Sequence, residues 1–328
     1  MTAATEETVV VRSESDFAAT IPTIVGFQPV KSLVTVFVGD GRVIVTARTD
    51  LPDNWQDCAA FLSETAQRVG ADEVLIALFF DRGHGDLPFT NEIDSLVTQL
   101  HDAGVKVTQA LLIDGGEYWS YLFRDESCCN EAGTLFKVAQ SLDGLAASRT
   151  RESITDQFAL RPDQRPSQRA YKVAEGLLKA PIAQQAEHAW HVVQELTTQR
   201  ESGTSETCPD TLVAFLHLAM VDIRIRDFVL GNVAVATDPS ALITTLVDVA
   251  LSAPEESRER LCGAAAALLA AFESSTIPAS TMCEHAGEDS LAGLVSRGIN
   301  AALPPTEMRS VLQMALPEVL EQLAKGDS

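Results

Sequence analysis

The order of hydrophobic and polar positions divides the chain into two parts. In the first 150 residues, short β-rich runs alternate with amphipathic helical patterns, which is typical of an α/β layer architecture. After about residue 168, nearly every segment has helical periodicity and a high alanine content. We therefore predict an α/β N-terminal domain over residues 1–148, a basic, proline-containing linker over 149–168 and an all-α helical-array domain over 169–328.

The N-terminal domain is predicted to contain a mixed sheet with helices covering it. Residues 32–38 and 42–48 flank Gly39-Asp40-Gly41, whose glycines permit the positive φ of a tight hairpin. The apolar run 73–81 predicts a strand buried on both faces, and the next strand, 105–113, follows by a right-handed parallel crossover. The turn at Asp114-Gly115-Gly116 then makes an antiparallel edge strand.

Helices are predicted where periodicity and end signals agree. One ends at Gly26 and should be kinked or split by Pro22, and another, over about 54–69, ends at Gly70. Short connections in the C-terminal half suggest antiparallel neighbours. The helices predicted there cover residues 168–178, 182–200, 209–230, 240–251, 255–273, 290–302 and 306–324.

The charge of the chain limits its partners. It has 46 acidic and 24 basic residues, a net charge of −22 and a pI near 4.5. Such a field repels phosphate backbones and anionic lipid, so we expect neither nucleic acid nor a membrane as partner. The N-terminus has no secretory pattern, and the longest apolar run, 261–272, is too short to cross a bilayer. With six cysteines and no export signal, we predict a cytoplasmic protein.

The segment 117–133, EYWSYLFRDESCCNEAG, departs furthest from what packing alone requires. We predict a strand with its two tyrosines on one face and Trp119 on the other, followed by a loop with Cys128-Cys129. Adjacent cysteines fit zinc spacing poorly, so no metal is predicted. The alternatives are a redox-switchable thiol pair and a packed loop in which cysteine acts as a small hydrophobe. The binding residues predicted in this segment are Trp119, Tyr121, Arg124, Asp125, Cys128 and Cys129.

A second candidate is the loop Asp81-Arg82-Gly83-His84-Gly85-Asp86. It follows a buried strand, and α/β proteins place ligands at the carboxyl ends of strands. His84 could act as a general base that Asp81 orients. The alternative is an exposed loop of turn-forming residues. The loop matches neither a phosphate-binding nor a dinucleotide motif, and we predict no cofactor.

A third candidate is a pair of arginines, Arg224 and Arg226, on one predicted helix. Asp222 could pair with Arg226, and Asp227 with Arg224, because these residues are four and three positions apart. The two arginines could capture an anionic ligand. The alternative is a charged seam between helices or between the domains.

Several motifs together resemble one family. They include Gly26-Phe27-Gln28-Pro29, Trp119-Ser120-Tyr121-Leu122 with Cys128-Cys129, and 222–227 (DIRIRD). On these residues the chain resembles an actinobacterial family catalogued only as a domain of unknown function, over almost its whole length. The resemblance implies a shared architecture and a cytosolic location but no assigned chemistry. Members of the family often carry cysteine where this chain has Phe123, so this chain keeps only the adjacent pair of a three-thiol cluster that could suggest a metal or redox site.

The sequence has no serine nucleophile elbow, HExxH pair, P-loop or Cys-x-x-Cys motif. Our leading hypothesis is a cytoplasmic regulatory or interaction protein that presents exposed edge aromatics and a helical groove to a protein or small-molecule ligand. The competing hypothesis is an enzyme that acts on a small neutral or cationic metabolite in the cleft between domains, with His84 as general base. The sequence leaves the oligomeric state open.

Overall fold

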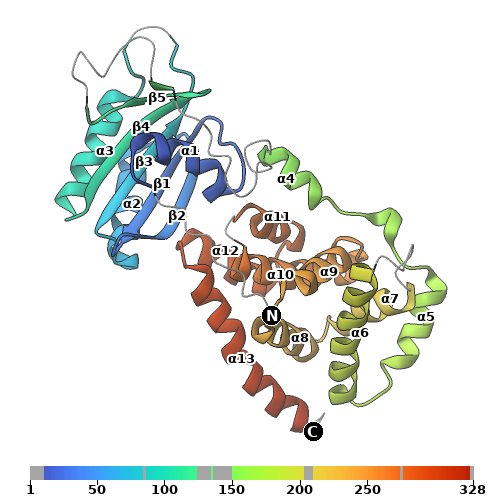
Figure 1. Cartoon of the computed structure of the whole chain (residues 1–328). Helices are drawn as coiled ribbons and strands as arrows, with labels where there is room; N and C mark the ends of the chain where they lie inside the picture. Colours follow the sequence, from blue (N-terminus) through green and yellow to red (C-terminus); the bar gives the residue numbers. More distant parts are fainter. Residues whose placement is uncertain are drawn as a thin grey trace. The chain divides into compact units, whose positions relative to one another are not determined.

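The computed structural model describes residues 11–83, 86–123, 134–135, 150–202, 210–273 and 276–325. The chain divides into two compact units, Met1–Arg151 and Glu152–Ser328. The first is an α/β unit with a mixed sheet and the second is all-helical, which confirms the predicted fold class (Figure 1). Within the described residues, no helix is both long and apolar enough to cross a membrane.

The sheet of the first unit has the order β2-β1-β3-β4-β5-β6 in its described part. Strands β3 and β4 run parallel, and the other neighbouring pairs are antiparallel. The two parallel strands finish together, because Phe79 lies opposite Ile113. The strands are β1 (Ser32–Gly39), β2 (Arg42–Asp50), β3 (Glu73–Phe79), β4 (Lys106–Asp114), β5 (Glu117–Ser120) and β6 (Thr134–Leu135).

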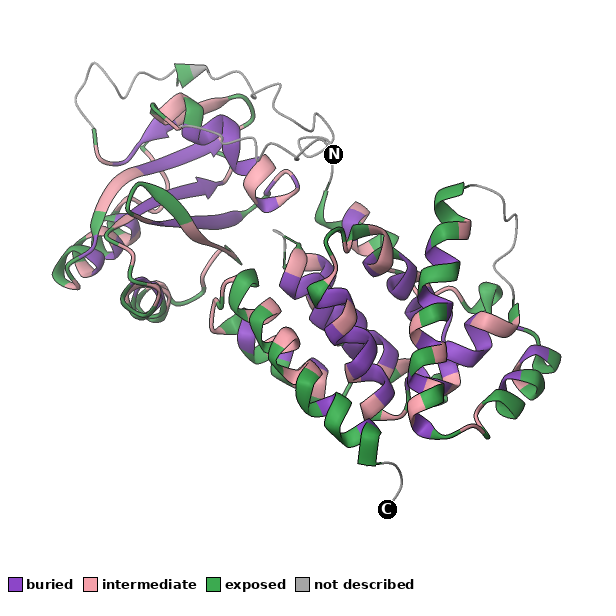
Figure 2. Ribbon diagram, turned by 60° about the horizontal axis from the view of Figure 1, so that its bottom comes forward, coloured by how far each residue is buried: buried purple, intermediate pink, exposed green. Residues whose placement is uncertain are grey.

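Helices cover both faces of this sheet. Helices α2 (Trp55–Val69) and α3 (Thr90–Asp102) pack on the face that carries Phe37 and Ile76. Helix α1 (Glu14–Val25) contacts β4 and β2 on the opposite side (Figures 1 and 2). Central strands with helices on both faces explain why β3 is a continuous apolar run in the sequence.

The helix ends of this unit follow local rules. Ser13 caps α1 by accepting a hydrogen bond from the Asp16 backbone N–H at 3.1 Å. Gly26 and Gly70 end α1 and α2 with φ of 82° and 69°, as the sequence predicts. The expectation that Pro22 splits α1 is wrong, because the helix is continuous through it.

The second unit consists of helices joined by short connections. They are α4 (Arg151–Gln157, which begins at the unit boundary), α5 (Gln168–Leu177), α6 (Ile182–Ser202), α7 (Asp210–Ala219), α8 (Ile223–Val235), α9 (Ser240–Leu251), α10 (Glu255–Phe272), α11 (Ile277–Ala286), α12 (Ser290–Asn300) and α13 (Pro305–Lys325). The predicted linker, 149–168, contains α4 and a short 3₁₀ helix, Pro162–Gln164. Residues 277–286 form α11, a helix that the sequence analysis missed.

The prediction of a single helix over 209–230 is wrong, because the chain breaks at 220–222. Asp222 then caps α8, its Oδ1 accepting the Arg224 backbone N–H at 2.9 Å. A side-chain oxygen bound to this amide satisfies a donor that has no partner within the helix. An aspartate between two apolar helical runs is therefore a start signal, and the continuous apolar periodicity concealed it.

Helix α10 lies at the centre of the helical unit. Residues 261–271 are all buried, and the helix contacts α7, α8, α9, α11, α12 and α13 (Figure 2). Most of these residues are alanine, so neighbouring helices can approach closely. At Gly263 even a methyl group would lie 2.5 Å from Oδ1 of Asp289, the residue that caps α12.

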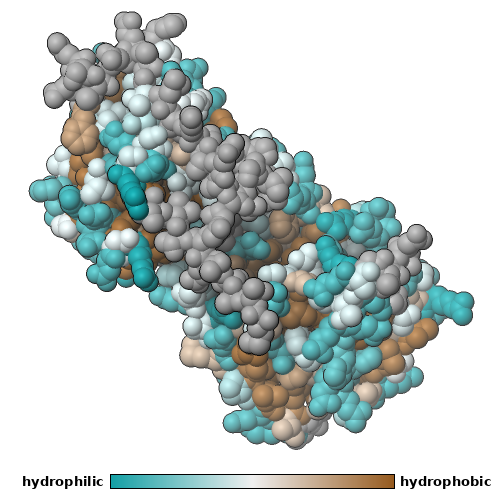
Figure 3. All heavy atoms as spheres, in the orientation of Figure 1, coloured by the Kyte–Doolittle hydropathy of each residue, from teal (hydrophilic) through white to brown (hydrophobic). Residues whose placement is uncertain are grey.

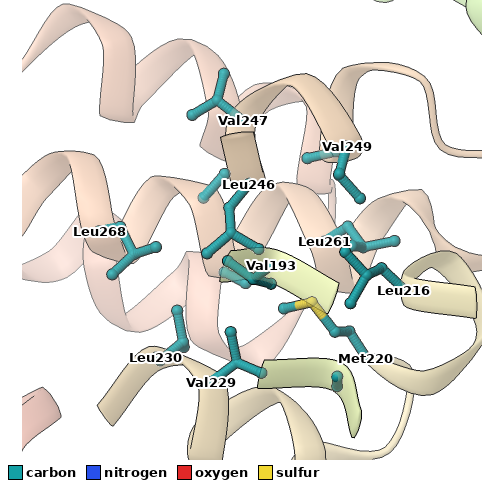
Figure 4. Close-up of a cluster of buried hydrophobic side chains, with 14 of the residues drawn as sticks. Val193, Leu216, Met220, Val229, Leu230, Leu246, Val247, Val249, Leu261 and Leu268 are labelled. Atoms are coloured by element: carbon teal, nitrogen blue, oxygen red, sulfur yellow. The ribbon is translucent and has the colours of Figure 1, made fainter. Parts of the chain in front are cut away.

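Larger side chains fill the layer around α10. Val193 of α6 lies among side chains from α7 to α10 in Figure 4. The other labelled members of this cluster are Leu216, Met220, Val229, Leu230, Leu246, Val247, Val249, Leu261 and Leu268. The apolar core of the unit is therefore continuous across these helices.

Helices α8 and α13 meet at a glycine. A Cβ added to Gly231 of α8 would lie 2.8 Å from Cβ of Leu316 of α13, which is closer than real Cβ contacts allow. In α12, by contrast, a Cβ on Gly293 would meet only Arg297 Nη1, at 3.7 Å. The absence of a side chain at Gly231 therefore sets how closely α13 packs.

These two glycines give opposite predictions for replacement by alanine. Gly231→Ala should lower the free energy of unfolding by about 1–3 kcal/mol, because the clash with Leu316 outweighs the better helix propensity. Gly293→Ala should raise it by up to about 1 kcal/mol through propensity alone. Urea denaturation followed by circular dichroism measures both. Equal effects in the two variants would contradict the close approach of α8 and α13.

Candidate functional site

The aromatic residues predicted to bind a partner are part of the core of the α/β unit. Trp119 is 4% exposed and Tyr121 is 2% exposed, and both belong to the cluster that packs against α2 and α3. The prediction that the two tyrosines share a face opposite Trp119 is wrong, because alternation along a strand puts positions 119 and 121 on one face. The prediction of exposed edge aromatics is wrong for the same two residues.

Both side chains hold the segment that follows β3. The Tyr121 hydroxyl donates a hydrogen bond to the Pro88 carbonyl at 2.7 Å. The guanidinium of Arg82 lies over the Trp119 ring, with Cζ 5.2 Å from the ring centroid, in a cation–π contact. The backbone N–H of Arg82 donates to Asp114 Oδ2 at 3.0 Å. Arg82 is therefore attached to β4 and β5, and Pro88 to the residue that follows β5.

Asp81, predicted to orient a general base, lies exposed at the carboxyl end of β3. Its Oδ1 accepts the backbone N–H of Gly83 at 2.8 Å, so the carboxylate closes a turn within its own loop. Next to Asp81, the backbone of Arg82 is bound by Asp114, and sequence analysis selected neither residue as functional. Asp114 could have been found from its position at the end of a buried strand. Because Gly115 and Gly116 follow it, the sequence analysis interpreted it only as part of a turn.

The end of this loop contains an unusual backbone. Phe89, which precedes α3, has φ of 57°, a conformation that is strained for a bulky residue. Its ring lies 5.1 Å from that of Phe80 and 5.4 Å from that of Trp55, centroid to centroid. These aromatic contacts hold the backbone in place. No sequence pattern points to a positive φ at a phenylalanine.

The remaining predicted residues of the α/β domain lie outside the described residues. They are His84, Arg124, Asp125, Cys128 and Cys129. The roles assigned to them stay predictions. Within the described residues, no group of three or more histidine, cysteine, aspartate or glutamate side chains could hold a metal ion.

Arg224 and Arg226 lie in the helical unit, and each binds an aspartate one or two residues away in sequence. Arg224 binds Asp222 through Nε at 3.1 Å and Nη2 at 2.8 Å, and this hydrogen bonding lowers the pKa of the Asp222 carboxyl. Arg226 is buried, and its Nε donates to Asp227 Oδ1 at 2.8 Å. The predicted pairing of Asp222 with Arg226 is wrong, because Asp222 precedes α8 instead of lying within it.

The most perturbed histidine lies inside the helical unit. His217 of α7 is fully buried, with Nδ1 2.7 Å from the Tyr171 hydroxyl and Nε2 2.8 Å from the Val249 carbonyl. Nε2 therefore carries the hydrogen, and Nδ1 accepts from Tyr171. Burial lowers the pKa of His217 to about 4 and raises that of Tyr171 to about 12.

This network joins helices and does not form a nucleophile. Ser252 Oγ lies 3.3 Å from His217 Nε2, but it donates its own hydrogen to the Val249 carbonyl at 3.0 Å. Both side chains are buried, Ser252 at 4% and His217 at 0% exposed. We conclude that the bonds hold α5 and α9 against α7. Perturbed pKa values also mark active sites, but here burial in a packed core explains them.

One hollow of about 290 Å³ lies between α11 and α12. Its lining includes Cys283, whose thiol donates weakly to the Ala292 carbonyl at 3.6 Å. Burial raises the pKa of this thiol, so the reactive thiolate is disfavoured. The lining residues are Ser280, Cys283, Glu284, Ser296, Ile299 and Asn300.

Among the residues that the structure describes, the most exposed large hydrophobic side chain is Met314 of α13. One side of this helix packs into the core through Met308, Leu312, Leu316, Val319 and Leu323. On the opposite side, Val311 is 60% exposed and Met314 is 69% exposed. Figure 2 shows exposed positions along the outer side of the helix that leads to the C-terminus, and Figure 3 shows hydrophobic side chains among hydrophilic ones at the surface. We define the α13 outer face as Glu307, Val311, Met314, Glu318, Glu321 and Lys325.

Polar contacts with α8 and α10 hold α13 in position, and they determine which side of α13 faces outward. Arg309 Nε donates to the Ala234 carbonyl at 3.2 Å, and its guanidinium lies over the Phe272 ring, with Cζ 4.6 Å from the centroid. Gln313 Nε2 donates to the same carbonyl at 2.8 Å. Polar side chains beside the packed stripe therefore bind the end of α8. Val311 and Met314 are held on a rigid helix.

A family model described as Domain of unknown function (DUF4192) matches residues 15–306. The match covers most of the chain, so the chain belongs to this family, which confirms the predicted resemblance to a domain of unknown function. No curated protein and no solved structure matches the chain.

Trp119→Ala should lower the free energy of unfolding by about 3–5 kcal/mol, because it opens a cavity in the core and removes the ring beneath Arg82. Phe61→Ala is the matched control, since Phe61 of α2 is also aromatic but exposed. We expect a change within about 0.5 kcal/mol for this control. Urea denaturation of the three proteins gives the comparison. A Trp119→Ala protein as stable as the control would contradict a structural role for Trp119.

The pKa of His217 predicts acid sensitivity. The folded state keeps His217 neutral down to about pH 4, whereas the unfolded chain takes up a proton near pH 6.5. Stability from this residue is therefore present above pH 6.5 and decreases by about 3 kcal/mol as the pH falls towards 4. Urea denaturation between pH 7 and pH 4 measures the decrease. His217→Leu should flatten it, whereas His101→Gln, at an exposed position, should not.

Proposed function

We propose that this member of the DUF4192 family is an interaction protein and that the α13 outer face is the surface to which another protein binds. The observation that supports the proposal is the exposure of Val311 and Met314 on a helix whose opposite side already packs in the core. A partner that covers these two side chains removes their apolar area from water, and this burial favours binding by about 25 cal/mol per Å². Neighbouring exposed apolar residues on a rigid element are typical of interaction sites.

The shape of this surface supports a protein as partner. Small-molecule sites are concave and enclose most of the ligand. The outer side of a single helix is convex, and its apolar residues recur at the spacing with which helices pack against each other. A second helix can cover Val311 and Met314 together. We further propose that the interaction is regulatory and takes place in the cytoplasm.

The proposed interaction surface lies on the helical unit, not on the α/β unit. Trp119 and Tyr121 are core residues and offer no apolar area to a partner. Arg224 and Arg226 are paired with aspartates. Val311 and Met314 need no rearrangement of the helix before they are accessible.

A second candidate function is an enzyme that acts on a small neutral or cationic metabolite, with His84 as general base. The observation that favours it is the position of Asp81 at the carboxyl end of the parallel strands β3 and β4, where α/β proteins bind ligands. A thermal-shift screen against metabolites separates the two functions. A metabolite that raises the Tm of wild type but not of His84→Ala would favour the enzyme, and the absence of any such metabolite would count against it.

The proposed docking surface can be tested by crosslinking. A photoreactive amino acid in place of Met314 should give discrete crosslinks to a partner in a native lysate. The same group in place of Val173, which is 51% exposed on α5, should not. In the Met314 background, Val311→Ser should reduce the yield at least about threefold by removing part of the apolar contact. Identical products from positions 314 and 173, or none from either, would contradict the proposal.

A further inference from the structure

We infer that the partner of the α13 outer face is a basic amphipathic helix. The inference rests on the proposed function, because it names the chemistry of a partner for that same surface. It comes from the residues before and after the apolar pair. Glu307 lies one turn before Val311, and Glu318 lies one turn after Met314.

The spacing is that of a helix-pairing seam. Glu307, Val311, Met314 and Glu318 occupy positions i, i+4, i+7 and i+11, so they form one line along the helix. A repeat of four and three residues is the pattern by which one helix packs along another. The complementary helix has two large apolar side chains about one turn apart. Its residues one turn before and after them lie beside the glutamates.

The charge of the face is acidic at both ends of the apolar pair. Glu318 accepts a hydrogen bond from Gln322 Nε2 at 3.4 Å, but neither Glu307 nor Glu318 forms a salt bridge with the described residues. Lys325, at the end of the helix, lies 3.9 Å from Glu321. Lysine or arginine on the partner would therefore meet carboxylates that have no cation beside them.

The other basic residue of α13 is turned away from this face. Arg309 binds the Ala234 carbonyl and lies over Phe272, so it contributes no positive charge to the outer side. The whole chain adds to the local field, since its net charge is −22. A field of this sign attracts a basic segment and speeds its association, and it repels an acidic one.

A second copy of the chain fits the same face poorly. Antiparallel pairing of Val311 and Met314 between two copies would bring Glu307 of one copy opposite Glu318 of the other. Parallel pairing would bring each glutamate opposite itself. Like charges at these flanking positions disfavour helix pairing. The charges therefore favour a partner of opposite sign over self-association.

The test uses the full chain and three helical peptides that share one apolar pattern. Their flanking positions are all lysine, all glutamine or all glutamate. Fluorescence anisotropy at about 50 mM and about 300 mM salt gives the affinities, because screening weakens contacts between exposed charges. We expect the lysine peptide to bind at least about tenfold more tightly than the glutamine peptide at low salt, and this difference to shrink at high salt.

Matched variants assign the binding to the face. The pair Glu307→Gln and Glu318→Gln should weaken the lysine peptide about three- to tenfold and leave the glutamine peptide unchanged. As a control, Glu187→Gln and Glu195→Gln remove the same charge from exposed positions on α6 and should have no effect. The pair Val311→Ser and Met314→Ser should weaken both peptides. Val173→Ser should weaken neither.

The outcomes separate the inference from the proposed function. Equal binding of the lysine and glutamine peptides, lost with Val311→Ser and Met314→Ser, would support the docking face but overturn the basic partner. If the α6 control variant weakens the lysine peptide as much as the α13 variant does, the peptide is attracted by the overall charge of the chain. That result would also overturn the basic partner. If no peptide binds while Met314 still crosslinks to a protein, only the inference fails. A dimer seen by light scattering and lost with Met314→Ser would identify a second copy instead.

Discussion

The close packing around α10 is the constraint on which the helical unit depends. Its buried residues, 261–271, are six alanines, one glycine, three leucines and one cysteine. Small side chains let six other helices approach this one helix, so the larger residues of those helices fill the layer around it. The position of α13 depends on this arrangement, because α13 packs on both α8 and α10.

Close packing on one side of α13 determines what its other side can do. Unlike α10, α13 packs through one stripe, which includes Leu316 against Gly231. Val311 directly precedes Leu312 of the packed stripe, and one residue rotates an α-helix by about 100°, so Val311 is turned away from the core. The same rigidity that makes Gly231 sensitive keeps Val311 and Met314 in a fixed relation. A partner helix would meet a surface that is already ordered, which reduces the entropy cost of binding.

Much of the fold could be predicted from the sequence, because hydrophobic periodicity and glycine positions are local signals. The parallel pair β3 and β4, the ends of α1 and α2, and the helical C-terminal half all follow from such signals. The break between α7 and α8 could not be read from apolar periodicity, since it depends on a cap at Asp222.

The candidate site was harder to predict because it depends on which apolar residues remain exposed. Trp119 and Tyr121 share a face with the core, as the strand period requires, but their burial also depends on α2 and α3 packing there. In α13, Met308 and Val311 are both apolar, but Met308 packs against the core and Val311 is exposed. Only the packing of α8 and α10 distinguishes the two. The family to which the chain belongs is described only as a domain of unknown function, so it assigns no chemistry that could resolve such a choice.

The contrast between α5 and α10 implies a gradient of local opening within the helical unit. Helix α5 packs on α7 and buries little more than Ala170 and Ala174, with the Tyr171–His217 hydrogen bond beside them. Its backbone amides should therefore exchange with solvent through small, frequent openings. The amides of α10 have neighbours on all sides and should exchange only when the whole unit opens. Protonation of His217 weakens the attachment of α5 first, so acid should widen the difference between the two helices.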